Sequence, residues 1–210
     1  MNDITPRVRP RNRRGEGDRL RVEILAAAAE LLEADGDERA VTLRAVARRA
    51  GIAAPSIYPH FADQPALMLQ VMRQAFDELA AWIRSALDEA GEDPQERLRT
   101  VCRAYLDFAR DHPERYRVMF GGNRTPFAAD CDPATLCDPG TLGAEAMRML
   151  TDCLADCLAA GDCTSTDPAA DAVALWLGLH GLAHQRAISP SFPWPADIVH
   201  RVAFPLSHLV

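Results

Sequence analysis

Two pairs of side chains are spaced as metal ligands can be spaced on a helix. Cys153 and Cys157 stand four residues apart, as do His180 and His184, which places each pair on one helix face. Thiolates and imidazoles in such an arrangement can bind zinc or another transition metal. Neither pair forms a CxxC knuckle, and the cysteines of a cytosolic protein are mostly reduced and buried. We therefore predict no metal site and keep a metal- or thiol-responsive protein as the alternative.

The histidines also raise the question of catalysis. His112, His180 or His184 could act as a general base, and Asp107 and Asp111 lie nearby in the sequence. The chain has no glycine-rich phosphate loop, no nucleophile elbow and no paired metal-binding motif. A single histidine on a helix is more often packed and hydrogen-bonded than catalytic. We therefore predict that the protein is not an enzyme, that it has no catalytic residue and that it uses no cofactor.

Arginines supply a different chemistry, the neutralisation of phosphates. Residues 1–17 read as a basic flexible arm in which Arg11, Arg13 and Arg14 could contact DNA phosphates or enter a minor groove. The alternative is a solvated tail. Formal charge is uneven, with a balance of +2 over residues 1–62 and −9 over residues 63–210. This distribution favours a protein that presents its N-terminal end to a polyanion.

The elements that would position such a site lie between Val41 and Phe61. Four apolar residues recur there at the spacing of one helix face: Leu43, Val46, Ala47 and Ala50. Thr42 stands at the N-cap position, and Gly51 stands where the chain must turn left-handed after the helix. A second short helix can begin near Ala54, with Pro55 in its first turn. The pattern predicts a helix-turn-helix, with an ordinary pair of surface helices as the alternative.

Residues 20–69 resemble the DNA-binding domain of TetR-family transcriptional regulators. The resemblance lies in V-T-L-R-A-V-A, in the glycine turn and in Tyr58 and Phe61, which are three residues apart. It implies that the N-terminus of the first helix of the motif, with Thr42 and Arg44, touches the DNA backbone.

Base reading is then expected from the second helix of the motif. Its candidate exposed positions are Ala53, Ala54, Pro55, Ser56, Tyr58 and His60, while Ile57 and Phe61 should face inward. No Arg, Asn or Gln stands among these candidates to make a bidentate base contact, so we expect modest specificity per half-site. Three residues depart from the family pattern. Ala53 replaces a hydroxyl cap, Pro59 removes a backbone donor, and Gln64 replaces a basic phosphate contact.

The remaining chain is predicted to be helical, because no stretch alternates apolar and polar residues as a strand does. The expected helices span residues 18–35, 64–89, 94–111, 113–120, 142–160, 168–188 and 196–209, with a loop at 121–140. We predict an all-α fold, with a three-helix head at 18–62 and an effector-binding and dimerisation domain at 63–210. No apolar run is long enough for a membrane span and no secretory signal is present, so we expect a cytoplasmic protein that does not associate with membranes.

Two segments of the second domain, H-P-E-R-Y-R-V-M-F and W-L-G-L-H-G, resemble a TetR-type C-terminal domain with a Trp-His-Gly (WHG) signature. The resemblance implies a homodimer in which the last two helices of each subunit form a four-helix bundle. The expected interface residues are Leu177, Gly178, Gly181, His184, Val199 and Val202. The alternative is that the two glycines serve packing within one chain.

Such a helical domain can bind an effector in an apolar cavity between its helices. The candidate lining residues are Trp82, Tyr105, Phe108, Tyr116, Met119, Phe120, Met147, Trp176 and His180, each of which could equally be a core residue. We expect a repressor that a small, largely apolar molecule releases from double-stranded operator DNA. A helical interaction protein with weakened DNA binding is a further alternative, favoured by Ala53, Pro59 and Gln64.

Overall fold

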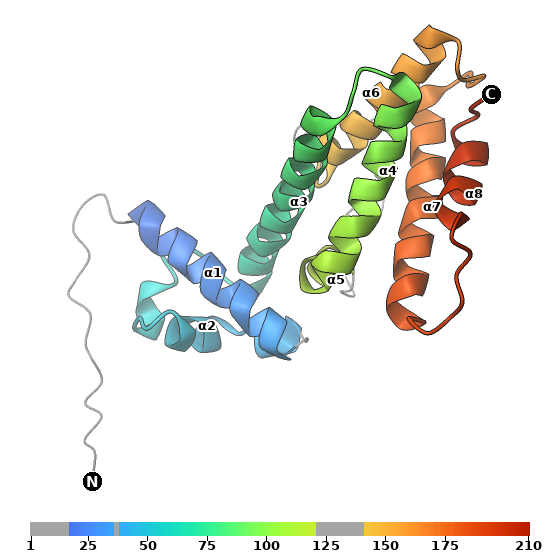
Figure 1. The fold of residues 1–210 in the computed structure, drawn as a ribbon. Coiled ribbons are helices and arrows are strands. Elements are labelled where there is room, and N and C mark those ends of the chain that lie inside the picture. Colours follow the sequence, from blue (N-terminus) through green and yellow to red (C-terminus); the bar gives the residue numbers. More distant parts are fainter. Residues whose placement is uncertain (1–16, 36–37, 121–140) are drawn as a thin grey trace. The chain divides into compact units, whose positions relative to one another are not determined.

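The fold is all-α, as predicted. The computed structural model describes residues 17–35, 38–120 and 141–210, and Figure 1 shows its ribbon. Its elements are α1 (Gly17–Asp35), η1 (Glu38–Ala40), α2 (Leu43–Arg49), η2 (Ala54–Ser56), α3 (Gln64–Glu89), α4 (Pro94–Asp111), α5 (Pro113–Phe120), α6 (Ala144–Ala160), α7 (Pro168–Ile188) and α8 (Ile198–Leu206). Within these residues the only β-type pairing is an isolated bridge between Cys163 and Leu209.

The chain divides into two compact units, residues 1–72 and 73–210. The boundary between the units falls inside α3, so this helix contributes residues to both. None of the described helices is long and apolar enough to cross a membrane. The predicted arm, with Arg11, Arg13 and Arg14, and the predicted loop at 121–140 lie outside the described residues.

The core of the first unit forms where α1 packs against α2. Ile24 and Ala28 of α1 are almost completely buried, and so are Val46 and Ala47 of α2, as the apolar spacing in α2 predicted. At the start of α2 the amide of Ala45 donates to Thr42 Oγ1 at 3.2 Å, which confirms the predicted N-cap.

The turn after α2 also follows the prediction. Gly51 has φ = +67°, a left-handed conformation that costs glycine little because it has no Cβ. The amide of Ile52 donates to the carbonyl of Ala47 at 2.9 Å, which satisfies one of the free carbonyls at the end of the helix. The chain therefore leaves α2 through a defined, hydrogen-bonded turn.

The second short helix of the motif begins at Ala54 with Pro55 in its first turn, as predicted, but it is a 3₁₀ helix of three residues. Residues Ala54–Ser56 form a short 3₁₀ helix, and hydrogen-bonded turns continue from it to His60. Pro55 and Pro59 have no amide hydrogen to donate, and Ala53 offers no side-chain hydrogen bond to cap a helix. The remaining bonds, such as Ser56 N to Ala53 O at 2.8 Å, are mostly of the i→i+3 type.

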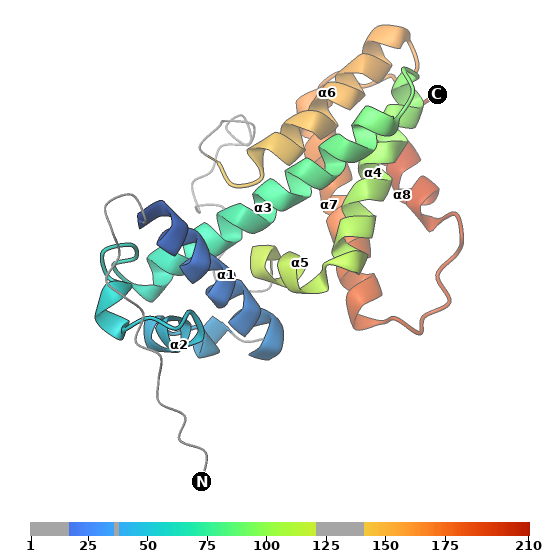
Figure 2. The ribbon, with the colours of Figure 1, turned by 60° about the vertical axis from the view of Figure 1, so that its left-hand side comes forward.

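In the second unit α4 is the central helix, and it packs against α5, α6, α7 and α8. Figures 1 and 2 show α7 and α8 side by side, next to α4. Asp93 caps α4 by accepting from the amide of Glu96 at 2.9 Å, and Pro94 occupies the first turn. The apolar side of α4 is buried almost throughout, from Leu98 to Phe108.

Two helix boundaries differ from the predictions. Helix α6 begins at Ala144, because Gly143 takes a left-handed conformation with φ = +78°. Helix α8 ends at Leu206, where Ser207 Oγ donates to the carbonyl of Ala203 at 2.7 Å. The chain then extends along the segment that joins α6 to α7, and Leu209 pairs there with Cys163.

Candidate functional site

The first candidate surface is the exposed side of the helix-turn-helix. At the N-terminus of α2, Thr42 and Arg44 are both exposed. The oxygen of Thr42 accepts the capping hydrogen bond, and its hydroxyl hydrogen remains able to donate. An exposed hydroxyl, a guanidinium and the positive end of a helix dipole can bind a phosphate.

The segment between α2 and α3 presents the predicted base-reading residues. Ile57 is completely buried and Phe61 nearly so, as expected, whereas Tyr58 is 52% exposed. Four of the other candidates, Ala53, Ala54, Pro55 and Ser56, are exposed or half-buried, as is His60. Ile57 and Phe61 therefore anchor the segment, while Ser56 and Tyr58 are exposed.

Arg21 holds this segment in place, a role that the sequence did not indicate. Its Nη1 donates to the carbonyl of His60 at 3.1 Å, and its guanidinium lies 4.6 Å from the centre of the Phe61 ring. Both contacts link α1 to the segment, which lies about forty residues further along the chain. No spacing rule connects residues so far apart, so only the folded arrangement reveals this contact.

Gln64 is the first residue of α3 and is half-buried. Asp63, directly before it, accepts from the amide of Ala66 at 2.8 Å and so caps the helix. A basic side chain at position 64 is thus absent, as the sequence indicated. Arg49, by contrast, is an exposed cation that pairs with Glu30 at 2.6 Å.

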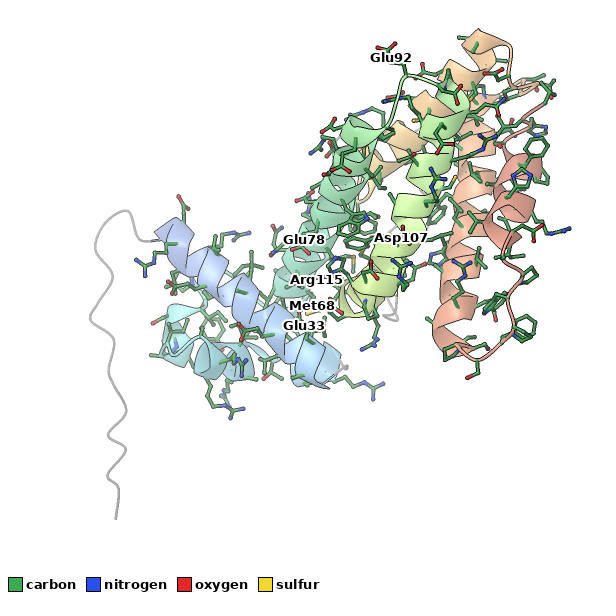
Figure 3. All side chains as sticks on the ribbon, in the orientation of Figure 1. Glu33, Met68, Glu78, Glu92, Asp107 and Arg115 are labelled. Atoms are coloured by element: carbon green, nitrogen blue, oxygen red, sulfur yellow. The ribbon has the colours of Figure 1, made fainter. Side chains whose placement is uncertain are left out.

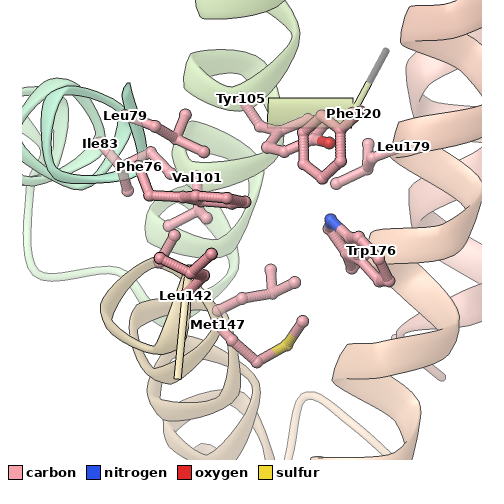
Figure 4. A pocket seen from close by; sticks show the side chains of 13 residues that line it. Phe76, Leu79, Ile83, Val101, Tyr105, Phe120, Leu142, Met147, Trp176 and Leu179 are labelled. Atoms are coloured by element: carbon pink, nitrogen blue, oxygen red, sulfur yellow. The ribbon is translucent and has the colours of Figure 1, made fainter. Parts of the chain in front are cut away.

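The second candidate site is an apolar cavity in the unit of residues 73–210. Figure 4 shows its lining side chains, which come from α3, α4, α5, α6, α7 and the residues just before α6. Of the nine predicted lining residues, four border it: Tyr105, Phe120, Met147 and Trp176. The other lining residues are Phe76, Leu79, Ile83, Val101, Leu142, Gly143, Ala146, Leu150 and Leu179. The cavity volume is about 40 Å³.

Tyr116 and His180, two more of the nine predicted residues, form a polar cluster beside this cavity. Tyr105 belongs to the cluster and also lines the cavity. Tyr116 Oη lies 2.6 Å from His180 Nδ1. Tyr105 Oη lies 3.2 Å from the same nitrogen and 3.4 Å from Tyr116 Oη. A hydrogen bond with Trp176 also reaches Tyr105. The cluster thus joins α4, α5 and α7 at one point.

All three titratable groups of the cluster are neutral near pH 7. Burial raises the pKa of Tyr116 to about 12 and the pKa of Tyr105 well above its usual value. Burial, and to a lesser extent the charge of His184, lowers the pKa of His180. The cluster can exchange hydrogen bonds but carries no net charge.

The remaining predicted pocket residues are Trp82, Phe108 and Met119, which lie away from the cavity. Trp82, which is 38% exposed, packs edge-on against Phe108, with 6.3 Å between the ring centres. Phe108 and Met119 are almost fully buried, and none of the three borders the cavity. Phe108 and Met119 are therefore core residues, and Trp82 packs beside Phe108 at the surface.

The predicted dimer residues fall into two groups. Leu177, Gly181 and His184 are exposed on one face of α7, together with Ile188, and Leu177 is 55% exposed. Gly178 instead faces α8, because a Cβ placed on it would lie 2.6 Å from Leu206 Cδ1 and 2.9 Å from Val202 Cγ1. Gly178 and Val202 thus pack α7 against α8 within one chain. Val199 is half-buried beside a groove between α4 and α8.

The described cysteines, Cys102, Cys153, Cys157 and Cys163, are free and buried. Burial raises the pKa of Cys102 and Cys157 to about 12 and that of Cys153 to about 11, so these thiols remain protonated at neutral pH. Among the described residues no group of three or more His, Cys, Asp or Glu side chains could hold a metal ion. Cys131 and Cys137 lie outside those residues.

The aspartates considered as partners of a catalytic base are held by an arginine. Arg110 lies 2.7 Å from both Asp107 Oδ1 and Asp111 Oδ1. The ring of His112 packs against Trp82 at 5.3 Å between ring centres. Figure 3 shows the side chains of this region, with Asp107 labelled.

Comparison with known proteins places this geometry in a family. Residues 24–71 match the model described as bacterial regulatory proteins of the tetR family. Residues 98–208 match the model described as a tetracyclin repressor-like C-terminal domain, which covers more than half of the chain. The chain belongs to the TetR family. The WHG subtype of the second domain stays a prediction.

Individual relatives agree with this assignment. The chain is 34% identical over 112 residues to the HTH-type transcriptional activator FasR of Mycolicibacterium smegmatis, which is 52% of this chain and 50% of FasR. It is 30% identical over 101 residues to the nucleoid occlusion factor SlmA of Photobacterium profundum, which is 48% of this chain and 51% of SlmA. The chain therefore spans about half the length of the curated relatives it matches.

Solved structures match over more of the TetR-family chain. A protein of unknown function from Rhodococcus sp. RHA1 has a TM-score of 0.73 at 27% identity, covering 90% of this chain and 93% of that one. The TetR-family regulator PfmR from Thermus thermophilus has a TM-score of 0.59 at 22% identity, covering 88% and 96%. At that identity, the likeness to PfmR concerns the fold alone.

Proposed function

We propose that this TetR-family regulator is a cytoplasmic homodimer that binds double-stranded operator DNA and is released by a small, largely apolar molecule. One observation carries the DNA-binding part. The capped N-terminus of α2 and the exposed segment before α3 are held in one unit by Thr42, Gly51 and Arg21. This arrangement presents phosphate-binding and base-contacting groups on neighbouring elements.

In this proposal the two parts of the surface have different roles. Thr42 and Arg44 bind phosphates and set the position of the unit on the duplex, helped by Arg11, Arg13 and Arg14 of the N-terminal arm. Ser56, Tyr58 and His60 contact base edges, and the apolar groups of Ala53, Ala54 and Pro55 can contact thymine methyls. Gln64 is uncharged, so it contacts the DNA backbone without neutralising a phosphate.

The exposed apolar face of α7 supports the homodimer. Leu177, Gly181 and Ile188 recur at spacings that place them on one side of the helix, and Ile188 is 60% exposed. Large apolar side chains gathered on one exposed helix face mark an interaction surface. A second copy of the same face would bury them and form a symmetric contact.

The cavity beside Tyr105 and Trp176 supports an apolar effector, because its walls are almost entirely hydrocarbon and aromatic. α5 carries Tyr116 of the polar cluster, and Arg115 of the same helix pairs with Glu78 of α3 at 3.0 Å (Figure 3). A ligand that displaces α5 would therefore act on α3 as well. Repression is the proposed mode, although the relative FasR is named an activator.

The test begins with the selection of genomic DNA fragments that the protein retains at physiological salt. Binding to a selected fragment is then measured by fluorescence anisotropy over a range of salt concentrations. Arg44→Ala should weaken binding to every sequence and reduce the salt dependence by about one phosphate contact. Tyr58→Phe should instead change the preference between fragments. The proposal fails if the protein retains no fragment in preference to bulk DNA.

A second candidate has one observation in its favour. The segment that should read bases is a three-residue 3₁₀ helix, which contains Pro55, followed by turns that contain Pro59. A helical interaction protein that has lost specific DNA binding would tolerate this geometry. Salt-insensitive binding to DNA, or none, together with a stable dimer would favour this candidate.

A further inference from the structure

We infer that the effector is an uncharged, slender apolar molecule that carries one hydrogen-bond acceptor, such as a ketone or ester carbonyl, which Tyr105 contacts. The inference rests on the proposed function only in calling the ligand an effector. Its basis is the chemistry of the cavity, beginning with the walls. Among the described lining residues none has a charged side chain, and the aromatic rings of Phe76, Tyr105, Phe120 and Trp176 form much of the surface (Figure 4).

Walls of this kind discriminate against ions of either sign. A carboxylate brought into the cavity would lose its hydration and find no cation, because His180 and both phenols are neutral near pH 7. An ammonium group could lie against the aromatic faces, but no carboxylate lines the cavity to pair with it. An uncharged ligand avoids both desolvation costs.

The hydrogen bonds of the polar cluster show which group is free to bind. The shortest contact joins Tyr116 Oη to His180 Nδ1 at 2.6 Å, and in the His180 tautomer that carries its proton on Nε2 the Tyr116 hydroxyl donates to Nδ1. The indole N–H of Trp176 can only donate, so Tyr105 Oη is the acceptor in the hydrogen bond between them. The Tyr116 hydroxyl and the Trp176 indole N–H are thus already used as donors within the protein.

The Tyr105 hydroxyl has only long contacts to the acceptors of the cluster. Of its two possible acceptors within the cluster, His180 Nδ1 lies at 3.2 Å, farther than it lies from Tyr116 Oη, and Tyr116 Oη lies at 3.4 Å, beyond the usual O–H···O distance. Tyr105 also borders the cavity, whereas Tyr116 and His180 do not. Its hydrogen can therefore turn to a ligand carbonyl at little cost, while Tyr116 keeps its bond to His180.

The size of the cavity limits the shape of the ligand. A volume of about 40 Å³ holds only about three water molecules. A ligand must therefore widen it by moving flexible side chains. Met147, which has three rotatable side-chain bonds, and Phe120, a half-buried residue at the end of α5, are the lining residues best able to move. A chain of methylene groups needs less widening than a fused ring system.

The experiment compares ligands that share one chain and differ in charge. Methyl octanoate, octanoate and octyltrimethylammonium are titrated into the full chain without DNA, and binding is followed by calorimetry and by the shift in melting temperature. The ester should bind at least about 100-fold more tightly than either ion. Equal or tighter binding of an ion, or no binding of the ester, would overturn the inference.

Variants then locate the contact. Tyr105→Phe keeps the ring but removes the hydroxyl, and it should weaken ester binding about tenfold. Arg19→Ala is the control, because Arg19 belongs to the other unit and its exposed side chain pairs with Glu23, and it should leave ester affinity unchanged. Ala146→Phe should fill the cavity and abolish binding while circular dichroism shows an unchanged helix content. An unchanged affinity in Tyr105→Phe would remove Tyr105 from the site.

Failure of this inference can be told apart from failure of the proposed function. Ester binding that leaves operator affinity unchanged would support the ligand class and refute ligand-controlled release. Release of the operator by a charged molecule, with no ester binding, would support ligand-controlled release and refute the ligand class.

Discussion

Replacing Gly178 by alanine should destabilise the protein relative to the same replacement at Gly181, three residues further along α7. Alanine is favoured over glycine inside a helix by about 0.8–1 kcal/mol, and this gain applies at both positions. At Gly178 the new methyl group would lie 2.6 Å from Leu206 Cδ1 and 2.9 Å from Val202 Cγ1, so α8 must shift or repack. Overpacking of this kind costs about 1–3 kcal/mol.

At Gly181 no atom lies within 4 Å of the added Cβ. The stabilisation from the higher helix propensity of alanine should therefore be fully realised at Gly181, whereas at Gly178 the cost of overpacking should offset it. We expect Gly181→Ala to be more stable than the natural protein by about 1 kcal/mol and Gly178→Ala to be less stable by about 0–2 kcal/mol. The gap between the two variants should be about 1–3 kcal/mol, or roughly 2–12 °C in melting temperature.

The assay is unfolding in urea, followed by circular dichroism at several protein concentrations. Concentration matters because Gly181 lies on the face proposed for the dimer, and a close contact there would make its effect depend on concentration. Equal midpoints for the two variants at low concentration would refute the account of α7–α8 packing.

Three further predictions concern other parts of the chain. Arg21→Ala should destabilise the first unit by about 1–2 kcal/mol and weaken DNA binding, because it removes the bond to His60 O and the contact with Phe61. Arg19→Ala, which breaks only an exposed pair with Glu23, is its control and should cost less than about 0.5 kcal/mol; equal effects in urea unfolding would contradict the role of Arg21. The lowered pKa of His180 means that the unfolded chain binds this proton first, so stability should fall as the pH drops below about 6.5. His180→Gln should reduce that fall in a series of urea midpoints from pH 7.5 to 5, and an unchanged slope would argue against burial of the ring. Thiol labelling at pH 8, mapped by peptide mass spectrometry, should leave Cys102, Cys153 and Cys157 unmodified until denaturant is added, since burial raises their pKa values; rapid labelling of the native protein would revive a thiol-responsive function.

Local signals in the sequence predicted the first unit well, because they depend on neighbouring residues. The Thr42 cap, the left-handed Gly51 and the burial of Ile57 and Phe61 each follow from residue type and short-range spacing. The second helix of the motif is shorter than was expected from the sequence. Pro59 and the missing cap at Ala53, noted above as departures from the family pattern, explain why this helix is short and 3₁₀.

The cavity was harder to predict, because its residues come from five helices and the residues before α6. Residue type pointed to aromatic side chains, but Trp82 and Phe108 pack against each other away from the cavity, while Phe76 and Leu142 line it. Choosing between them requires the packing of α3, α4 and α6, which periodicity does not give. The contact of Arg21 with His60 was missed for the same reason.

Native mass spectrometry of the full chain on a selected operator duplex tests the central claim most directly, with a duplex cut to one half-site as the comparison. We predict two protein copies on the full duplex at physiological ionic strength, and weak binding to the half-site alone. A single copy on the full duplex, or equal occupancy of unrelated DNA, would contradict the account.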